Sequence, residues 1–127
     1  MSDSTTNILD LKKTIAKFHR DRNWAKWHDP KSVALSILIE AAELAEHFQW
    51  SQKEHVAKFD RKKWREIEHE LADVLIYCIG FANDNTIDIS AAVSRKIALN
   101  RLKYPIHLFK KHYDFGMRKV KMAHRKK

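Results

Sequence analysis

Two pairs of acidic residues, each set in a mostly apolar stretch, most constrain how this chain can fold. They are Glu40 with Glu43 and Glu70 with Asp73. Residues three apart lie on one side of an α-helix, so each pair predicts two carboxylates that point the same way. The segment between the pairs is long enough for one helix to end and a second to return alongside it. The spacing therefore predicts a helical hairpin that brings four carboxylates together.

The rest of the chain also favours helices. Its 127 residues include only two glycines and two prolines, which is typical of an all-α protein. We expect one bundle of four main helices with short connecting helices near residues 52 and 107. Helical spacing of apolar residues predicts four main helices. The first starts after candidate N-caps at residues 4–7 and runs to about Trp27, and the others span 31–49, 60–83 and 89–102.

The helix ends are predicted from capping residues. Pro30 suits the first turn of the second helix, with either Asp29 or Ser32 as its cap. The segment Ser51–Glu54 has the pattern of a capping box, so we expect it to start a short connecting helix. Asp88 is a good cap for the fourth main helix.

The predicted helix 31–49 is apolar on nearly every side. One polar stripe, formed by Ser36, Glu40, Glu43 and His47, interrupts it. Such a helix is normally buried, and a monomer of this size has too little chain to cover it. We therefore expect partner subunits to cover part of it, so that the bundle is completed by homo-oligomerisation.

Positive charge is concentrated at the end of the chain. Residues 1–94 carry 13 Lys and Arg against 15 Asp and Glu, whereas residues 95–127 carry 12 against 1. A basic end is commonly a solvated face or a mobile tail, and it can also attract polyphosphate or nucleic acid. We expect a domain over 1–109 and a partly disordered basic extension over 110–127. A non-enzymatic helical module that binds nucleic acid through this extension is an alternative, although we consider a nucleic-acid partner the weaker hypothesis.

The sequence predicts a cytoplasmic protein without a membrane partner. Cys78 is the single cysteine, so no intrachain disulfide can form. The first residues lack the basic and apolar regions of a signal peptide, and the longest apolar run, residues 74–82, is too short to cross a bilayer.

The four carboxylates favour a hard cation. Facing one another, they would repel and lose hydration unless a cation neutralised them. Oxygen ligands suit Mg²⁺, with Mn²⁺ as a substitute. A single acidic pair is usually a solvated surface, but two pairs flanked by apolar residues favour the metal. A di-iron bundle is the alternative, because Glu66 and His69 match one of the two Glu-x-x-His motifs that it needs.

The chain lacks the usual phosphate-binding loops. Two glycines, Gly80 and Gly116, cannot build a Walker A or dinucleotide turn. A triphosphate would then be held by metal and by side chains near the end of the fourth helix, namely Lys96, Asn100, Arg101 and Lys103. Trp24 and Trp50 stand at predicted helix ends, where an indole can stack on a nucleobase or simply pack in a core. His28 could add a hydrogen bond to the base or stabilise a helix end.

The motifs together resemble the MazG-like all-α nucleotide pyrophosphohydrolases, and within them the dCTP pyrophosphatase group. The likeness extends from about residue 8 to 109. Its motifs are Asn23-Trp24, Trp27-His28-Asp29-Pro30-Lys31, Glu40 to Glu46, Phe48-Gln49-Trp50, Glu70 to Tyr77, Lys96, Asn100 and Tyr104-Pro105.

The resemblance implies Mg²⁺-dependent cleavage of a nucleoside triphosphate, such as dCTP or a modified form, to the monophosphate and pyrophosphate. This reaction removes nucleotides from the cellular pool. A metal-bound water would attack the phosphate, with no single side chain assigned as base. The resemblance also implies dimers or tetramers with sites at subunit interfaces. In the implied site the metal ligands are Glu40, Glu43, Glu70 and Asp73, the base lies between Trp24 and Trp50, and Tyr77, Lys96 and Asn100 hold the nucleotide.

Two positions depart from the family pattern. Ile39 stands where many members have an acidic residue before the first pair, which leaves the number of metal ions open. Ile15 stands where vertebrate dCTP-preferring members have a histidine, which leaves the preferred base open.

Overall fold

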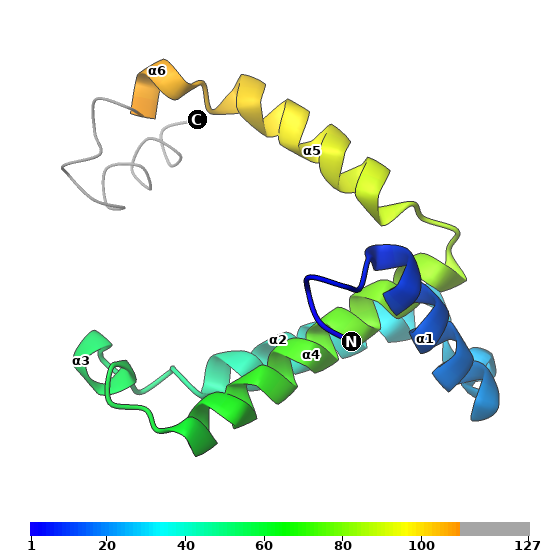
Figure 1. The fold of residues 1–127 in the computed structure, drawn as a ribbon, viewed down its shortest axis with the longest axis horizontal. Helices are drawn as coiled ribbons and strands as arrows, with labels where there is room; N and C mark the ends of the chain where they lie inside the picture. Colours follow the sequence, from blue (N-terminus) through cyan, green and yellow to red (C-terminus); the bar gives the residue numbers. More distant parts are fainter. Residues whose placement is uncertain (110–127) are drawn as a thin grey trace. The chain divides into compact units, whose positions relative to one another are not determined.

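The computed structural model describes residues 1–109, and the predicted basic extension lies outside these residues. The described residues form helices without a β-strand, so the all-α prediction is confirmed (Figure 1). They fall into two compact units, residues 1–89 and residues from Ser90 onward. The helices are α1 (Ile8–Asp21), the 3-10 helix η1 (Trp24–Trp27), α2 (Pro30–Glu46), α3 (Lys53–Val56), α4 (Arg61–Asp84), α5 (Ile89–Lys103) and α6 (Ile106–Phe109).

Helix α1 is shorter than predicted. It begins with a capping box, in which Asn7 and Asp10 each accept a hydrogen bond from the other's backbone N–H at 3.1 Å. The prediction that it reaches Trp27 is wrong, because Asn23 has a φ of 54°. An α-helix cannot continue through this left-handed conformation. The two tryptophans at 24 and 27 are instead carried by the separate turn η1.

The cap of α2 is Asp29. Its Oδ1 accepts a hydrogen bond from the Ser32 N–H at 3.1 Å, and Pro30 occupies the first turn. This arrangement decides between the two candidate caps. The predicted capping box at Ser51–Glu54 is wrong, because α3 begins after Gln52 with no side-chain bond to its first turn.

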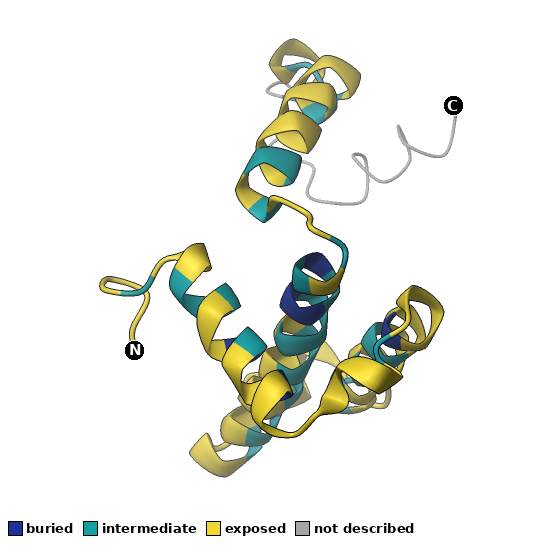
Figure 2. Ribbon diagram, turned by 90° about the vertical axis from the view of Figure 1, so that its right-hand side faces the viewer, coloured by how far each residue is buried: buried dark blue, intermediate teal, exposed yellow. Residues whose placement is uncertain are grey.

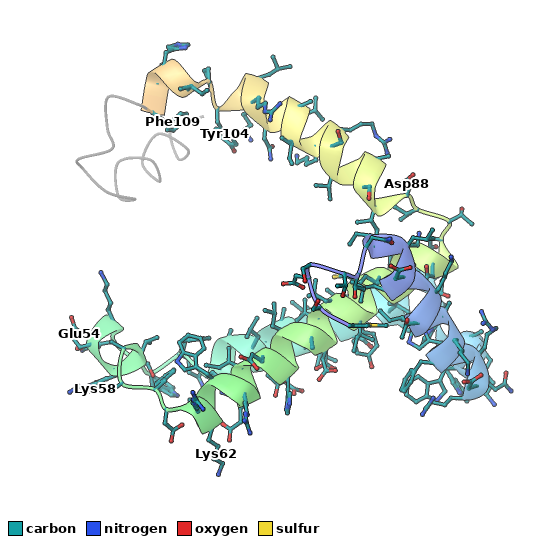
Figure 3. All side chains as sticks on the ribbon, in the orientation of Figure 1. Glu54, Lys58, Lys62, Asp88, Tyr104 and Phe109 are labelled. Atoms are coloured by element: carbon teal, nitrogen blue, oxygen red, sulfur yellow. The ribbon has the colours of Figure 1, made fainter. Side chains whose placement is uncertain are left out.

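Helices α2 and α4 pack along each other and form the hairpin predicted from the acidic pairs (Figure 1). The short α3 connects them, and Figure 3 labels Glu54 and Lys58 in this connection and Lys62 in the first turn of α4. Helix α1 packs against α4 as well. The Asn83 amide donates to the Lys12 carbonyl at 3.0 Å, which ties α1 to the C-terminal end of α4.

The core of the described residues is small. It consists of Ile15, Val33, Ile67, Ile79 and Ala82. Large apolar side chains of the hairpin remain about half exposed, and Figure 2 shows how little of the ribbon is buried. Leu71 is one of these side chains. The others on α2 and α4 are Leu35, Leu38, Ile39, Trp64 and Leu75.

The second unit contains most of α5 and all of α6. The Tyr104 N–H donates to the Asn100 carbonyl at 2.8 Å, in the last turn before Pro105 interrupts the helix. Within residues 1–109, no helix combines the length and the apolar character needed to cross a bilayer.

Candidate functional site

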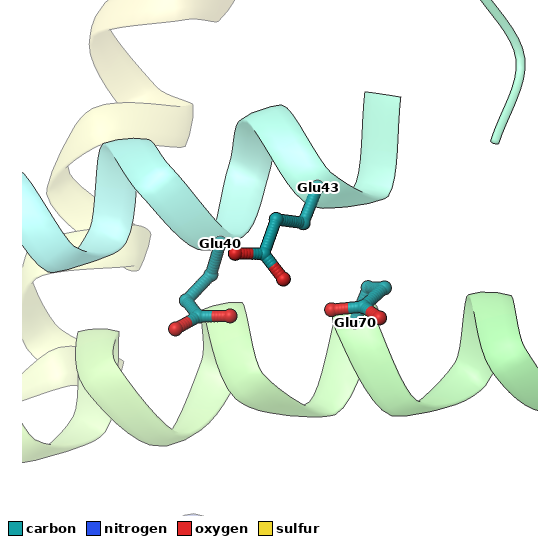
Figure 4. A group of neighbouring side chains, drawn as sticks. All are labelled: Glu40, Glu43 and Glu70. Carbon is teal, nitrogen blue, oxygen red and sulfur yellow. The ribbon is translucent and has the colours of Figure 1, made fainter. Parts of the chain in front are cut away.

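Three of the four predicted metal ligands meet between α2 and α4. Helix α2 supplies Glu40 and Glu43, and α4 supplies Glu70 from the opposite side of the gap (Figure 4). One carboxylate oxygen from each lies within 4.8 Å of the other two. Glu40 and Glu70 are half-buried, while Glu43 is exposed. Packing of α2 against α4 in the antiparallel hairpin therefore brings acidic residues from both sequence pairs into one group.

Asp73, the fourth predicted ligand, lies outside this close group but acts on it through its charge. The pKa of Glu40 is raised, first by burial and then by the negative charges of Glu43, Asp73 and Glu70. A raised carboxyl pKa means that the ionised form is disfavoured where it stands. The four acids thus share one local field, and a cation would relieve their repulsion.

A polar recess adjoins the acidic group. His47 Nε2 lies 3.9 Å from Glu70 Oε1, and Lys63 Nζ lies 3.8 Å from Glu66 Oε2. The recess has a volume of about 340 Å³, and its lining residues are Glu43, Glu46, His47, Gln49, Lys63 and Glu70. It provides room for a polar group beside the carboxylates.

An aromatic pocket lies about one helical turn from the acids along both helices of the hairpin. Ser36 precedes Glu40 by four residues on α2, and Tyr77 follows Asp73 by four residues on α4. The pocket has a volume of about 240 Å³ and is lined by Trp24, Trp27, His28, Ser32, Val33, Ser36 and Tyr77. Three residues predicted for nucleotide binding, Trp24, His28 and Tyr77, are therefore brought together.

A polar cluster that the sequence did not predict supports this pocket. His28 Nδ1 lies 3.2 Å from Asp84 Oδ2, and the rings of His28 and His19 meet edge to face with centroids 4.6 Å apart. His19 is 7% exposed. Burial lowers its pKa, the nearby His28 lowers it further, and Asp84 opposes the change.

The signal for this cluster was present but weak. His19 follows Ile15 by four residues on the apolar face of α1, and Gly80 sits inside α4, where glycine is unfavourable. A Cβ at Gly80 would lie 2.9 Å from His19 Cε1. Gly80 therefore marks a close approach of α1 to α4, as glycines in helix interiors can.

The remaining predicted site residues are Trp50 and three residues of the second unit. Trp50 follows the far end of α2, is 87% exposed and does not line the Trp24 pocket. Lys96 and Asn100 are on α5, in the second unit, the first exposed and the second half-buried. Arg101 lines a recess of about 570 Å³ with residues 104–107. Their role in phosphate binding stays a prediction.

The di-iron alternative gains no support from the geometry. His69 is exposed, and neither it nor Glu66 belongs to the close acidic group. Within residues 1–109 that group is the one set of three potential ligands found at metal-binding distance.

Comparison with known proteins gives consistent matches. The sequence model of the MazG-like family matches residues 35–114. dCTP pyrophosphatase 1 of Bos taurus is 33% identical over 107 residues, which cover 83% of this chain and 63% of that protein. The Rattus norvegicus dCTP pyrophosphatase 1 is 35% identical over 103 residues, covering 80% of this chain and 61% of that protein. The chain thus spans less than two thirds of the length of these curated relatives.

A solved structure agrees with the sequence matches. The crystal structure of a pyrophosphatase from Archaeoglobus fulgidus superposes with a TM-score of 0.73 at 36% sequence identity. The match covers 83% of this chain and 98% of that one. The fold, and the resemblance predicted from the motifs, are confirmed.

Proposed function

The chain belongs to the MazG-like family, and on that premise we propose that it hydrolyses a nucleoside triphosphate to the monophosphate and pyrophosphate. The substrate we propose is a pyrimidine deoxynucleotide, such as dCTP or a modified form. The relatives named dCTP pyrophosphatase support this choice. The cellular role would be removal of unwanted nucleotides from the pool.

One observation carries the proposal: along α2, the acidic group lies one helical turn from an aromatic pocket. The oxygens of Glu40, Glu43 and Glu70 converge within 4.8 Å. Trp24 and Tyr77 line the neighbouring pocket. A nucleotide has the same two parts, a charged triphosphate and a flat base, so a base in the pocket could extend its phosphates toward the acids.

The acidic group fits Mg²⁺. Its donors are carboxylate oxygens, which hard cations prefer, and its charges disfavour one another in the absence of a cation. We propose Glu40, Glu43, Glu70 and Asp73 as the ligands, with Mn²⁺ as a substitute. Bound there, the ion would neutralise the triphosphate and lower the pKa of water.

The side chains of the site then bind and orient the substrate. The Trp24 indole offers a face for stacking, and the Tyr77 hydroxyl can hold the sugar or phosphates. We propose that Lys96, Asn100 and Arg101 bind phosphate oxygens. His47 Nε2 lies 3.9 Å from Glu70 Oε1, and we assign it no role as a base.

We also propose that the active form is a homodimer or homotetramer in the cytoplasm. The half-exposed leucines of α2 and α4 support an oligomer, because they form an apolar surface that a second copy would bury. Trp50, 87% exposed, could then complete a base pocket across the interface. Light scattering after size exclusion would give the mass, and a monomer at micromolar concentration would contradict this part.

A panel of nucleoside triphosphates tests the function. Each of the four dNTPs, dUTP and the ribonucleotides is incubated with Mg²⁺ or with EDTA, and the products are separated by ion-exchange chromatography. We expect monophosphate and pyrophosphate only with Mg²⁺, and loss of this activity in Glu43→Ala. Glu54→Ala, which changes an exposed glutamate of α3 outside the site, is the matched control. Diphosphate and phosphate as products, or full activity in Glu43→Ala, would exclude the proposal.

A further inference from the structure

Asp84 holds the histidine of the aromatic pocket in one orientation. Asp84 Oδ2 lies 3.2 Å from His28 Nδ1, and the two side chains are 30% and 10% exposed. An ionised carboxylate can only accept hydrogen bonds, so the proton of this bond belongs to His28 Nδ1. In a neutral imidazole, Nε2 then carries a lone pair and acts as an acceptor.

The free nitrogen of His28 opens onto accessible space. Among residues 1–109, the bond to Asp84 is the one hydrogen bond of the His28 side chain. Half-buried and buried residues in this range have no fully enclosed side-chain nitrogen or oxygen that lacks a partner. His28 Nε2 is therefore not fully enclosed, and His28 is one of the residues that line the aromatic pocket.

Packing also restrains the His28 ring. The His19 ring meets it edge to face at an interplanar angle of 85°. His19 is itself buried and lies against Gly80, where an added Cβ would be 2.9 Å from its Cε1 atom. An imidazole held by a carboxylate on one nitrogen and by a buried ring presents its other nitrogen in a defined direction.

We propose that Asp84 is a positioning residue that sets the base selectivity of the site by holding His28 with Nε2 as a hydrogen-bond acceptor. The pocket would then favour a nucleobase with an amino group at its edge, as in cytosine or adenine, over one with a carbonyl there, as in uracil or thymine. An amino group donates to the Nε2 lone pair, whereas a carbonyl oxygen would place a second acceptor opposite this lone pair. This inference rests on the proposed function, since it assumes a base in this pocket.

The matched pair dCTP and dUTP tests the inference, because the two differ in donor against acceptor at one ring edge. We expect the wild type to show a higher kcat/KM for dCTP. In Asp84→Asn the amide can donate to Nδ1, which favours the other tautomer and puts a proton on Nε2. The ratio of kcat/KM for dCTP over dUTP should fall by roughly 10- to 100-fold. Asp21→Asn, which changes an exposed carboxylate paired with Lys17, should leave the ratio unchanged.

Imidazole ¹⁵N chemical shifts give a second measurement that needs no substrate. They distinguish a protonated Nδ1 from a protonated Nε2 in the wild type at about pH 8, where imidazole is usually neutral. The signal of His28 is assigned from its absence in His28→Gln, a variant that should also lose the preference for dCTP, because an amide can both donate and accept. If the protein hydrolysed no triphosphate, the proposed function would be wrong, but the tautomer of His28 could still be measured. A wild-type proton on Nε2, a wild-type preference for dUTP, or an unchanged ratio in His28→Gln would overturn the inference.

Discussion

The two ends of the site are built in opposite ways. At the acidic end, Glu40, Glu43 and Glu70 place like charges within 4.8 Å, and the ionised form of Glu40 is disfavoured there. At the aromatic end, the polar groups are paired, as in His28 with Asp84. The ring of His19 packs against that of His28, and the absence of a Cβ at Gly80 leaves room for His19. The acidic end is therefore electrostatically unfavourable without a ligand, whereas the contacts at the aromatic end are mutually favourable.

This difference teaches which role each end has. Residues that are unfavourable as they stand are typical of a site that binds a ligand, because the ligand supplies the missing interaction. Residues that pack and pair among themselves contribute to stability as well as to recognition. Changes at the acidic end should therefore remove activity without loss of stability, whereas changes at the aromatic end should affect both.

The largest effect is expected for Glu70→Gln. The amide keeps the shape of the side chain but lacks its charge, so Mg²⁺ should bind poorly. We expect kcat/KM to fall roughly 1,000-fold, which corresponds to a loss of about 4 kcal/mol in transition-state stabilisation. The free energy of unfolding without metal should not decrease. Steady-state kinetics and urea titration measure the two quantities. Glu66→Gln, one turn away on α4 and outside the close group, should change kcat/KM less than about threefold. Equal losses of kcat/KM in Glu70→Gln and Glu66→Gln would show that the close acidic group has no special role in catalysis.

Gly80→Ala should show the opposite signature. Alanine favours a helix by about 1 kcal/mol, but its Cβ would lie 2.9 Å from His19 Cε1. Because His19 is buried against Trp24 and His28, we expect a net loss of about 1–2 kcal/mol in the free energy of unfolding. Urea titration measures it.

A double-mutant cycle separates the clash from the intrinsic effect of alanine. In a His19→Ala background the clash is absent, so Gly80→Ala should become neutral or stabilising. A stabilising effect of Gly80→Ala in the wild-type background would show that His19 moves freely and that the aromatic end is less rigid than its packing indicates.

Sequence reasoning succeeded where the determinants were local. Helical periodicity predicted α2, α4 and α5, and the acidic spacing predicted four converging carboxylates, of which Glu40, Glu43 and Glu70 form the close group. It failed where one residue or a distant contact decided the outcome. The left-handed backbone of Asn23 ends α1 early, and the pairing of His28 with Asp84 joins residues 56 apart in the chain. Such a contact depends on how α1, η1 and α4 pack, and no spacing rule encodes it.

A smaller effect is expected for Glu40→Gln, and its sign depends on pH. The pKa of Glu40 is raised in the folded protein, so the folded state binds this proton more tightly than the unfolded state does. The ionised carboxylate therefore destabilises the fold, beginning as pH rises through the unfolded value and fully above the folded value. Without metal, Glu40→Gln should be more stable than the wild type at neutral pH by at most about 1 kcal/mol, because the group is only half-buried.

Thermal unfolding at neutral and acidic pH, with EDTA or with Mg²⁺, measures these differences. The advantage of Glu40→Gln should shrink toward acidic pH, where Glu40 is protonated in both states. Mg²⁺ should raise the Tm of the wild type more than that of the variant, since a ligand stabilises the state that binds it. A destabilised Glu40→Gln in EDTA would mean that the carboxylates support one another through contacts rather than oppose one another.

The smallest effect is expected from removing residues 110–127. Both ends of the site lie between Trp24 and Asp84, so a chain that stops after Phe109 should keep kcat/KM within about twofold of the full chain. The removed segment is rich in lysine and arginine, and basic segments bind polynucleotides in a salt-dependent way because binding releases counterions. Any salt-sensitive binding of single-stranded DNA should therefore disappear with this segment while catalysis persists. A large loss of kcat/KM on truncation would instead make the basic extension a third part of the site, acting on the phosphates between the acidic and aromatic ends.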